Sequence, residues 1–379
     1  MDFDSVNRVA FHCEWFKEEA MVIKSFLLIY YPTEKAGELF DSKSQKRFLR
    51  KTSLDLCRED FYIGSKLDIF GRQIEIVDFA DEFTRKLLGK SRQRIFLLVK
   101  TPLINKASNI LKAFEKSGFC FANALMVRLN EQYATYLFGD RARGNQEITN
   151  LISEIVSGPV IGIEMFADHA FQKLEDSSFS NVEAPRRNKN IVSAELEFLF
   201  SEEIYKKGIY FSKSQEDAND ELKKFFCNEI NQFNTALLNN TVLGIIKPHI
   251  FKEGKVGECL HEIINCGYKI TAFKICVIDR SNCEEFFEVY RGVCHEYMQM
   301  ISELASGPCL ALEIQKPNSQ DIHKEFREFC GPKNPDIAKQ LRPNTLRAKF
   351  GKNKVLNAIH VTDLPDDVIL ELQYIFKIL

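Results

Sequence analysis

A sequence repeat constrains the fold of this chain more than any other feature. The stretch "ISEIVSGPVIGIEM", residues 152–165, returns as "ISELASGPCLALEI", residues 301–314. A glycine that ends an earlier helical pattern returns as well, as Gly118 and Gly267. Both pairs of markers are 149 residues apart (301 − 152 and 267 − 118). Two markers at one spacing indicate that a unit of the chain is present twice.

Within each copy the residue pattern predicts strand, helix, strand, helix, strand. "KITAFKICVI" and "CLALEI" are short apolar runs of the kind that form strands. One helix is indicated by apolar residues that share a helical face, namely Val256, Cys259, Leu260, Ile263 and Ile264. This order predicts an α+β fold with two ferredoxin-like (βαββαβ) units, each an antiparallel sheet covered by helices on one face.

The rest of the chain divides around the two copies. Its 379 residues exceed one ordinary domain, and "KSFLLIYYP", "KLDIFG" and "QIEIVDF" predict a small β domain before the repeat. We therefore expect a β domain at 1–88, a first copy at 91–205, a connector at 206–238 and a second copy at 239–379. The connector should hold one amphipathic helix, with an apolar face of Leu222, Phe225, Phe226, Ile230 and Phe233.

Composition excludes several classes of function. The 51 basic and 53 acidic residues nearly balance, which argues against a nucleic-acid or anionic-membrane partner. The first residues lack a secretory signal pattern, and no run approaches the length of a membrane span. Eleven cysteines without a CxxC pair indicate reduced thiols in a cytoplasmic setting and make a zinc site unlikely.

Six polar residues of the second copy together suit a polyphosphate: Lys247, Arg327, Arg347, Asn357, His360 and Glu371. Cationic side chains stabilise phosphoryl oxygens, and a neutral imidazole can attack phosphorus. Glu371, eleven residues after His360 on a helical pattern, can fix the tautomer of the ring. However, a histidine that ends an apolar run is usually a core or rim residue, and no glycine-rich phosphate loop is present. Spacing alone leaves both interpretations open.

Several motifs resemble those of a known family. The "KP" after the first strand, the "SGP" turn, "TLRAKFG" and "NAIHVTD" followed by an acidic helix are similar to nucleoside diphosphate kinases. The resemblance covers residues 91–379 as two modules. Residues 1–88, with "RFLRKT" and "FYIGSKLDIFGRQIEIVDFADEFT", resemble the DM-ten domain, a PH-like β module. This three-part layout is similar to that of the nucleoside diphosphate kinase 7 family.

The resemblance implies a role for each candidate residue. His360 falls on the phosphate-accepting histidine and Glu371 on the glutamate that orients it. Lys247 falls on the lysine that holds the γ-phosphate, and the nucleotide would enter with Mg²⁺. The implied reaction is a ping-pong transfer from NTP to NDP through phosphohistidine. Further nucleotide contacts are implied for Arg327 and Arg347 at the phosphates, Asn357 at the sugar, Phe287 or Tyr297 at the base, and Thr362 beside the histidine.

The chain also departs from the family pattern. In the second copy Val361 replaces a glycine, His249 an aspartate and Lys333 a threonine, changes that are expected to weaken nucleotide affinity. The first copy keeps Lys100, but no histidine occurs between His169 and His249. A nucleophile cannot be replaced by an arginine or a lysine that stays protonated. We therefore predict a pseudo-kinase module in the first copy and a competent site in the second alone.

The resemblance implies two cellular settings, the γ-tubulin complex at microtubule-organising centres and the interior of ciliary doublet microtubules. We predict a microtubule-associated scaffold, a microtubule inner protein of the axoneme, bound to tubulin and neighbouring axonemal proteins. The expected location is the cytoplasm, the cytoskeleton and the ciliary axoneme, with the centrosome or basal body as a second site. The alternative is an active kinase or γ-tubulin complex regulator whose main role is catalytic.

Overall fold

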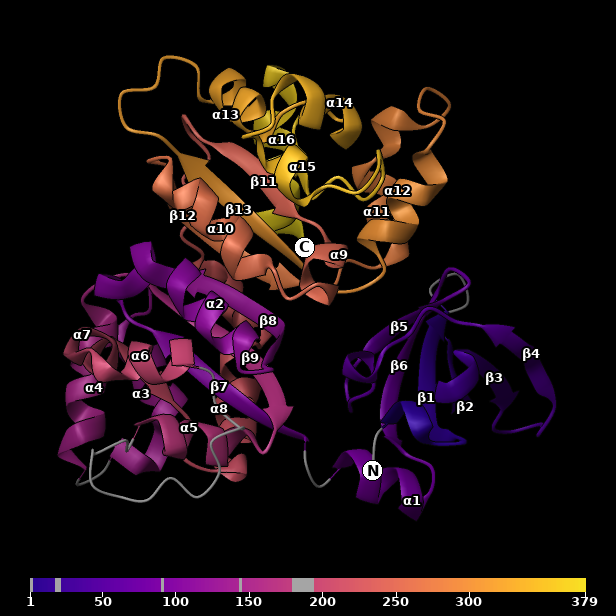
Figure 1. Cartoon of the computed structure of the whole chain (residues 1–379). Helices are drawn as coiled ribbons and strands as arrows, with labels where there is room; N and C mark the ends of the chain where they lie inside the picture. The colour runs from indigo at the N-terminus through magenta and orange to yellow at the C-terminus, as the bar shows by residue number, and fades with distance from the viewer. Residues whose placement is uncertain (1–2, 18–21, 90–91, 143–144, 179–193) are drawn as a thin grey trace.

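Two antiparallel sheets organise the chain (Figure 1). The structure is a computed structural model that describes residues 3–17, 22–89, 92–142, 145–178 and 194–379. The first sheet has six strands and the second has eight. The described residues contain no helix with the length and apolar character that a bilayer crossing needs.

The N-terminal sheet curls around its own core, which confirms the β-rich prediction for this region. Its strand order is β4-β3-β2-β1-β6-β5. Inward side chains such as Phe11, Phe26 and Phe61 are fully buried, and in β2 burial alternates along the strand, as expected when one face of a sheet covers a core. The strands are β1 (Val9–Lys17), β2 (Val22–Tyr31), β3 (Ala36–Asp41), β4 (Arg47–Ser53), β5 (Lys66–Ile69) and β6 (Arg72–Phe79), followed by α1 (Glu82–Thr84).

The larger sheet has the same strand order in its two halves. The order is β10-β7-β9-β8-β12-β13-β11-β14. If the four strands of each half are numbered in chain order, the first half has the order 4-1-3-2 and the second half 2-3-1-4. Both are the ferredoxin-like order, and the second is the first in the opposite direction. The halves meet where β8 pairs with β12. The strands are β7 (Arg92–Val99), β8 (Cys120–Val127), β9 (Val160–Asp168), β10 (Ile209–Phe211), β11 (Val242–Ile246), β12 (Lys269–Cys276), β13 (Cys309–Gln315) and β14 (Ile359–Val361).

Helices cover both faces of this sheet, so the prediction of helices on one face was wrong. Strand β11 shows why: Val242 and Ile246 belong to one core and Leu243 and Ile245 to another. The first-half helices are α2 (Ala107–Lys116), α3 (Glu131–Phe138), α4 (Gln146–Val156), α5 (Ala170–Ser178), α6 (Ala194–Ser201), α7 (Glu203–Gly208) and α8 (Gln215–Phe225). The second-half helices are α9 (Pro248–Lys252), α10 (Val256–Asn265), α11 (Arg280–Phe286), α12 (Tyr297–Leu304), α13 (Ile322–Cys330), α14 (Pro335–Leu341), α15 (Leu346–Phe350) and α16 (Val368–Gln373).

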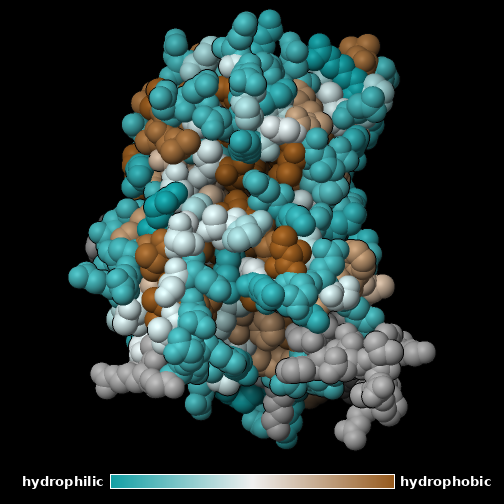
Figure 2. All heavy atoms as spheres, turned by 90° about the vertical axis from the view of Figure 1, so that its left-hand side faces the viewer, coloured by the Kyte–Doolittle hydropathy of each residue, from teal (hydrophilic) through white to brown (hydrophobic). Residues whose placement is uncertain are grey.

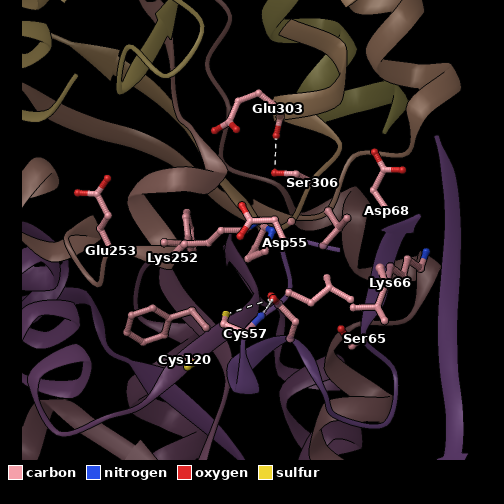
Figure 3. A pocket seen from close by; sticks show the side chains of 18 of the residues that line it. Asp55, Cys57, Ser65, Lys66, Asp68, Cys120, Lys252, Glu253, Glu303 and Ser306 are labelled. Atoms are coloured by element: carbon pink, nitrogen blue, oxygen red, sulfur yellow. Dashed lines mark hydrogen bonds between the residues drawn. The ribbon is translucent and has the colours of Figure 1, made fainter. Parts of the chain in front are cut away.

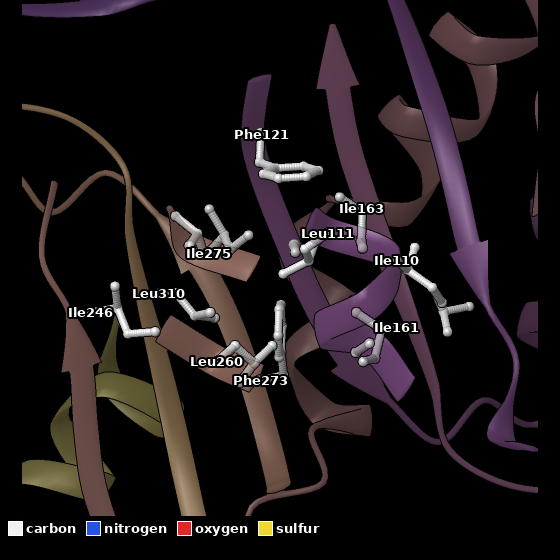
Figure 4. Packing of buried hydrophobic residues seen from close by; sticks show 14 of the residues in the cluster. Ile110, Leu111, Phe121, Ile161, Ile163, Ile246, Leu260, Phe273, Ile275 and Leu310 are labelled. Carbon is white, nitrogen blue, oxygen red and sulfur yellow. The ribbon is translucent and has the colours of Figure 1, made fainter. Parts of the chain in front are cut away.

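One hydrophobic core runs through both halves on one face of the sheet. Figure 4 shows Leu111 of α2 and Leu260 of α10 in this shared core. The two helices approach so closely that a Cβ at Gly257 would lie 2.3 Å from the backbone nitrogen of Lys112. The carboxylate of Glu115 accepts the backbone N–H groups of Val256 and Gly257 at 2.9 and 2.8 Å, at the start of α10. Because such close packing excludes water, the halves form a single packed unit.

The N-terminal domain contacts both halves of the large sheet. Gln73 donates to the carbonyl of Ile278 at 2.9 Å in the second half. Against the first half, the rings of Tyr62 and Phe166 pack in a tilted arrangement with centroids 4.1 Å apart. On the face of the molecule shown in Figure 2, hydrophilic residues predominate and apolar residues form separate patches. A continuous apolar band, which would mark a large obligate interface, is therefore not seen on this face.

Candidate active site

His360 lies in the middle of β14, the short edge strand of the second half. It stands opposite Ile245 of β11, and its side chain is buried. Its Nε2 is 3.0 Å from Oε2 of Glu371 in α16, and the same oxygen accepts a hydrogen bond from Thr362 at 2.7 Å. With Nε2 engaged by the carboxylate, Nδ1 is the nitrogen that remains for chemistry. The rings of Phe286 and Phe287 pack against the imidazole, with centroids 5.2 and 5.5 Å away.

A strained turn places this histidine. Ala358 has a φ of 72°, and the N–H of Ile359 donates to the carbonyl of Asn357 at 2.9 Å. A hydrogen bond between residues two apart around a positive φ is a γ-turn of the rare, strained kind. Since the backbone N–H of Lys247 also donates to the carbonyl of Ala358, the turn is tied to the end of β11. Strained backbone of this kind persists where the surrounding structure holds it, and it clusters at functional sites.

His360 opens onto a small cationic cavity of about 130 Å³. This volume is below the roughly 300–1,000 Å³ of whole-ligand pockets, so the cavity can enclose only part of a nucleotide, such as its phosphates. Its charged lining residues are Lys247, Arg327, Lys333, Arg347 and Asp363. Four cations against one carboxylate favour a multiply charged anion.

Backbone contacts fix the cations of this cavity. Lys247 donates from Nζ to the carbonyl of Val355 at 2.7 Å, and burial lowers the pKa of Lys247 to about 7. Arg347 donates to the carbonyls of Gly331 and Ile359 at 2.8 and 3.0 Å, and burial lowers its pKa as well. An incoming phosphate would therefore meet donors that are already positioned and poorly solvated, which strengthens each charge–charge contact.

Asn357 and Arg327 also face the cavity. Asn357 donates from Nδ2 to the carbonyl of Lys333 at 3.2 Å, whereas its Oδ1 is buried without a hydrogen-bond partner. A buried acceptor without a partner is costly unless a ligand supplies a donor, such as a sugar hydroxyl. Arg327 donates to Asp363 at 2.6 Å, so a phosphate here would have to compete with this carboxylate.

The two aromatic residues proposed for the base lie outside the phosphate cavity. Neither Phe287 nor Tyr297 lines the cavity: Phe287 is buried against His360, and the Tyr297 hydroxyl donates to the carbonyl of Glu284. The wall contains Tyr290 instead, whose hydroxyl bonds Asp363 and whose ring lies 4.9 Å from Nζ of Lys333. Tyr290 was missed because the chain around it departs in length from the family pattern. Thr362 lies behind the site, on Glu371.

Mg²⁺ fits this site as part of a nucleotide. Among the described residues, no group of three or more histidine, cysteine or acidic side chains could hold a metal ion. The cavity offers one carboxylate, Asp363, beside four cations, and such a lining would repel a bare divalent cation. The metal would therefore be held by the phosphates, where it neutralises their charge.

The first half has a tyrosine at the corresponding place. Tyr210 of β10 pairs with Leu98, the second-to-last residue of β7. In the second half, His360 pairs in the same way with Ile245, the second-to-last residue of β11. Its hydroxyl and that of Ser212 both donate to the buried carboxylate of Glu221, eleven residues after the tyrosine. This is the spacing of His360 and Glu371. Arg141 also donates to Glu221, at 2.9 Å.

The surroundings of Tyr210 do not favour a nucleophile. Burial and the nearby Glu221 carboxylate raise the pKa of the Tyr210 phenol, so the reactive phenolate is disfavoured. The strand and helix that carry this cluster, β10 and α8, fall in the segment 206–238 that the sequence suggested as a connector. In the structure β10 pairs with β7, and α8 packs on the same sheet.

Comparison with known proteins now decides the family. Residues 240–378 match the family model described as nucleoside diphosphate kinase. The chain is 39% identical to "Nucleoside diphosphate kinase homolog 7" of Rattus norvegicus over 382 residues, which cover 98% of this chain and 94% of the relative. The chain belongs to the nucleoside diphosphate kinase homolog 7 family. The member from Mus musculus is 38% identical over the same shares of both chains.

A shorter relative matches about a third of this homolog 7 chain. The nucleoside diphosphate kinase of Aquifex aeolicus is 32% identical over 133 residues, which cover 35% of this chain and 91% of that enzyme. Because the family model matches residues 240–378, the C-terminal half has the ferredoxin-like nucleoside diphosphate kinase fold. The imidazole, its carboxylate and the four cations described above all lie in this half.

Proposed function

We propose that residues 239–379 transfer the γ-phosphate of an NTP to an NDP through phosphohistidine at Nδ1 of His360. The lone pair of Nδ1 attacks the γ-phosphorus, the bond from phosphorus to the bridging oxygen breaks, and the first NDP leaves. The terminal phosphate oxygen of a second NDP then attacks phosphorus, and the P–N bond breaks. The hydrogen bond between Nε2 of His360 and Glu371, next to four cations, is the observation that carries this proposal.

Each residue has a task in this transfer. Glu371 holds the ring so that Nδ1 carries the lone pair, and it stabilises the positive charge that develops on the imidazole. Lys247 and Arg347 stabilise the negative charge of the transferred phosphoryl group. Arg327 binds the phosphates after its ion pair with Asp363 breaks. Asn357 would accept a sugar hydroxyl through its free Oδ1. Mg²⁺ would arrive with the nucleotide and be held by its phosphates.

Phosphorylation of the purified chain tests this proposal. Incubation with γ-labelled ATP and Mg²⁺ should give a label that is stable to base and lost in acid. His360→Ala should abolish the label, and Glu371→Gln should lower the transfer rate by roughly 10–100-fold, as loss of an orienting partner does. His261→Ala removes a histidine of α10 outside the site and should change nothing. An unlabelled parent chain, or a label that survives His360→Ala, would refute the proposal.

We further propose that the other parts of the chain serve as a scaffold on microtubules. Residues 1–88 would be a PH-like domain of the DM-ten type. The first half would be a degenerate kinase module that begins near residue 91 and includes β10 and α8. The replacement of the nucleophile by Tyr210, whose hydroxyl donates to buried Glu221, supports a non-catalytic role for the first half. A rigid three-part unit of this kind suits repeated binding to a lattice.

The proposed partners are tubulin in the ciliary doublet and its axonemal neighbours, with the γ-tubulin complex as the second candidate. Co-sedimentation of the full chain with taxol-stabilised microtubules, beside a γ-tubulin pull-down, separates these settings. The scaffold proposal predicts that binding persists in His360→Ala. Loss of binding in that variant, with its fold intact, would favour the alternative in which catalysis is the main role.

A further inference from the structure

A second, larger cavity lies between the N-terminal domain and both halves of the large sheet (Figure 3). Its volume is about 810 Å³, within the roughly 300–1,000 Å³ of ligand pockets, which occur preferentially between domains. All three parts of the chain line it, for example Leu67 from the N-terminal domain, Phe121 from the first half and Met298 from the second. Nothing in the proposed phosphate transfer uses this cavity.

An edge strand forms part of its wall. Strand β5 is the last strand of the N-terminal sheet and pairs only with β6 in the described structure. Its residues Lys66, Leu67 and Asp68 line the cavity. The outer edge of such a strand presents unpaired backbone N–H and C=O groups, which an extended peptide can satisfy by adding a further strand.

The side chains around the cavity combine apolar walls with excess negative charge. Phe119, Phe166 and Phe251 contribute to the apolar part. The lining includes six acidic residues and two lysines. Two of the acids have basic side chains as partners: Glu303 pairs with His249, and Glu253 with Lys255 and Lys352.

Glu115 uses both carboxylate oxygens at the start of α10, which leaves Asp55, Asp60 and Asp68 against Lys66 and Lys252. Figure 3 shows Asp68 and Lys66 on one side of the cavity, with Lys252 and Glu253 opposite. The carboxylate of Asp68 accepts the N–H of Gly71 at 2.7 Å, which leaves acceptor positions for a cation. The excess of carboxylates therefore complements a basic ligand.

We propose that this cavity binds an extended segment of a partner protein that carries a lysine or arginine beside a bulky apolar residue. The segment would pair with the free edge of β5. Its apolar side chain would enter between the phenylalanine walls, and its cation would reach Asp68. The free strand edge is what favours a peptide over a small amphipathic amine, which could use the walls and the charge but not the backbone groups.

Fluorescence anisotropy on the full chain tests the proposal with defined probes. A labelled ten-residue peptide of alternating leucine and lysine should bind, and one of alternating leucine and glutamate should not. Asp68→Lys should weaken binding by about tenfold, the ratio that corresponds to 1.4 kcal/mol. Lys66→Glu should strengthen it, which a merely unfolded variant could not do. Asp366→Lys changes an exposed acid outside the cavity and serves as the matched control.

Two further readouts locate the probe. Hydrogen exchange at β5 should slow when the leucine–lysine peptide binds. Alkylation of Cys57 in the cavity wall should slow relative to exposed Cys266 outside it. Equal binding of the glutamate peptide would overturn the proposal. So would octylamine binding as tightly as the peptide without protection of β5, because the site would then take small amines. Neither result depends on phosphate transfer at His360.

Discussion

The buried lysine of the phosphate cavity should make the free chain less stable at neutral pH than a chain without it. Lys247 is 4% exposed, and burial lowers its pKa from the ordinary 10.5 to about 7. At about 1.36 kcal/mol per pKa unit, this difference corresponds to roughly 5 kcal/mol. Because the folded pKa lies below the unfolded one, the penalty is fully present below pH 7. It fades as pH rises toward 10.5, where both states are neutral.

Lys247→Met removes the charge at similar volume. It also removes the hydrogen bond to the Val355 carbonyl, which costs about 1 kcal/mol. The free energy of unfolding should therefore increase by about 3–4 kcal/mol at pH 6 and by only about 1 kcal/mol at pH 9. Urea denaturation of the parent and the variant at pH 6, 7, 8 and 9 measures this difference directly.

Lys100→Met is the matched control for this experiment. Lys100 directly follows β7 as Lys247 directly follows β11, but its Nζ is paired with Glu154 at 2.5 Å. Its removal should not stabilise the chain at low pH. A stabilisation by Lys247→Met that is constant from pH 6 to pH 9, or a destabilisation at pH 6, would show that the buried ammonium does not oppose folding.

Three further predictions follow from other contacts. Gly257→Ala should lower the free energy of unfolding by about 1–3 kcal/mol, because its Cβ would lie 2.3 Å from the Lys112 nitrogen. Urea denaturation measures this against Gly307→Ala, whose Cβ would meet its nearest neighbour at an ordinary 3.8 Å. Tyr210→Phe should cost about 1–3 kcal/mol, since buried Glu221 loses a donor, yet it should leave the phosphate label on His360 intact; loss of label would contradict a non-catalytic first half. Binding of Mg·ADP at pH 8 should take up close to one proton, because phosphates raise the pKa of Lys247 from about 7. Calorimetry in two buffers with different ionisation enthalpies would show it, and uptake that persists in Lys247→Met would assign the proton elsewhere.

The sequence predicted the fold where regular residue patterns mark the strands and helices. The repeat and its apolar runs led to the strand order of the C-terminal half, because strands of β-branched residues between helical patterns permit few arrangements. The same reasoning predicted helices on one face of the sheet, whereas the structure has helices on both faces. Strand β9 is buried along nearly its whole length, and its mostly apolar sequence, interrupted by Glu164, was the available signal of a sheet covered on both faces.

Local geometry was harder to anticipate. Nothing in the residue types marks Ala358 for a positive φ, since alanine does not favour that region. Tyr290 could not be placed because the segment before it departs from the family length. The Tyr210 cluster, by contrast, was readable. Tyr210, Ser212 and Glu221 have the same spacing as His360, Thr362 and Glu371, although the first half has no histidine at this place.

The segment just before His360 touches both cavities. Val355 and Leu356 form part of the interdomain wall, and the Val355 carbonyl holds the Lys247 ammonium in the phosphate site. One short stretch of backbone thus serves as wall for the interdomain cavity and as hydrogen-bond acceptor for the phosphate site. A substitution at Val355 or Leu356 therefore has to satisfy the packing of both places at once.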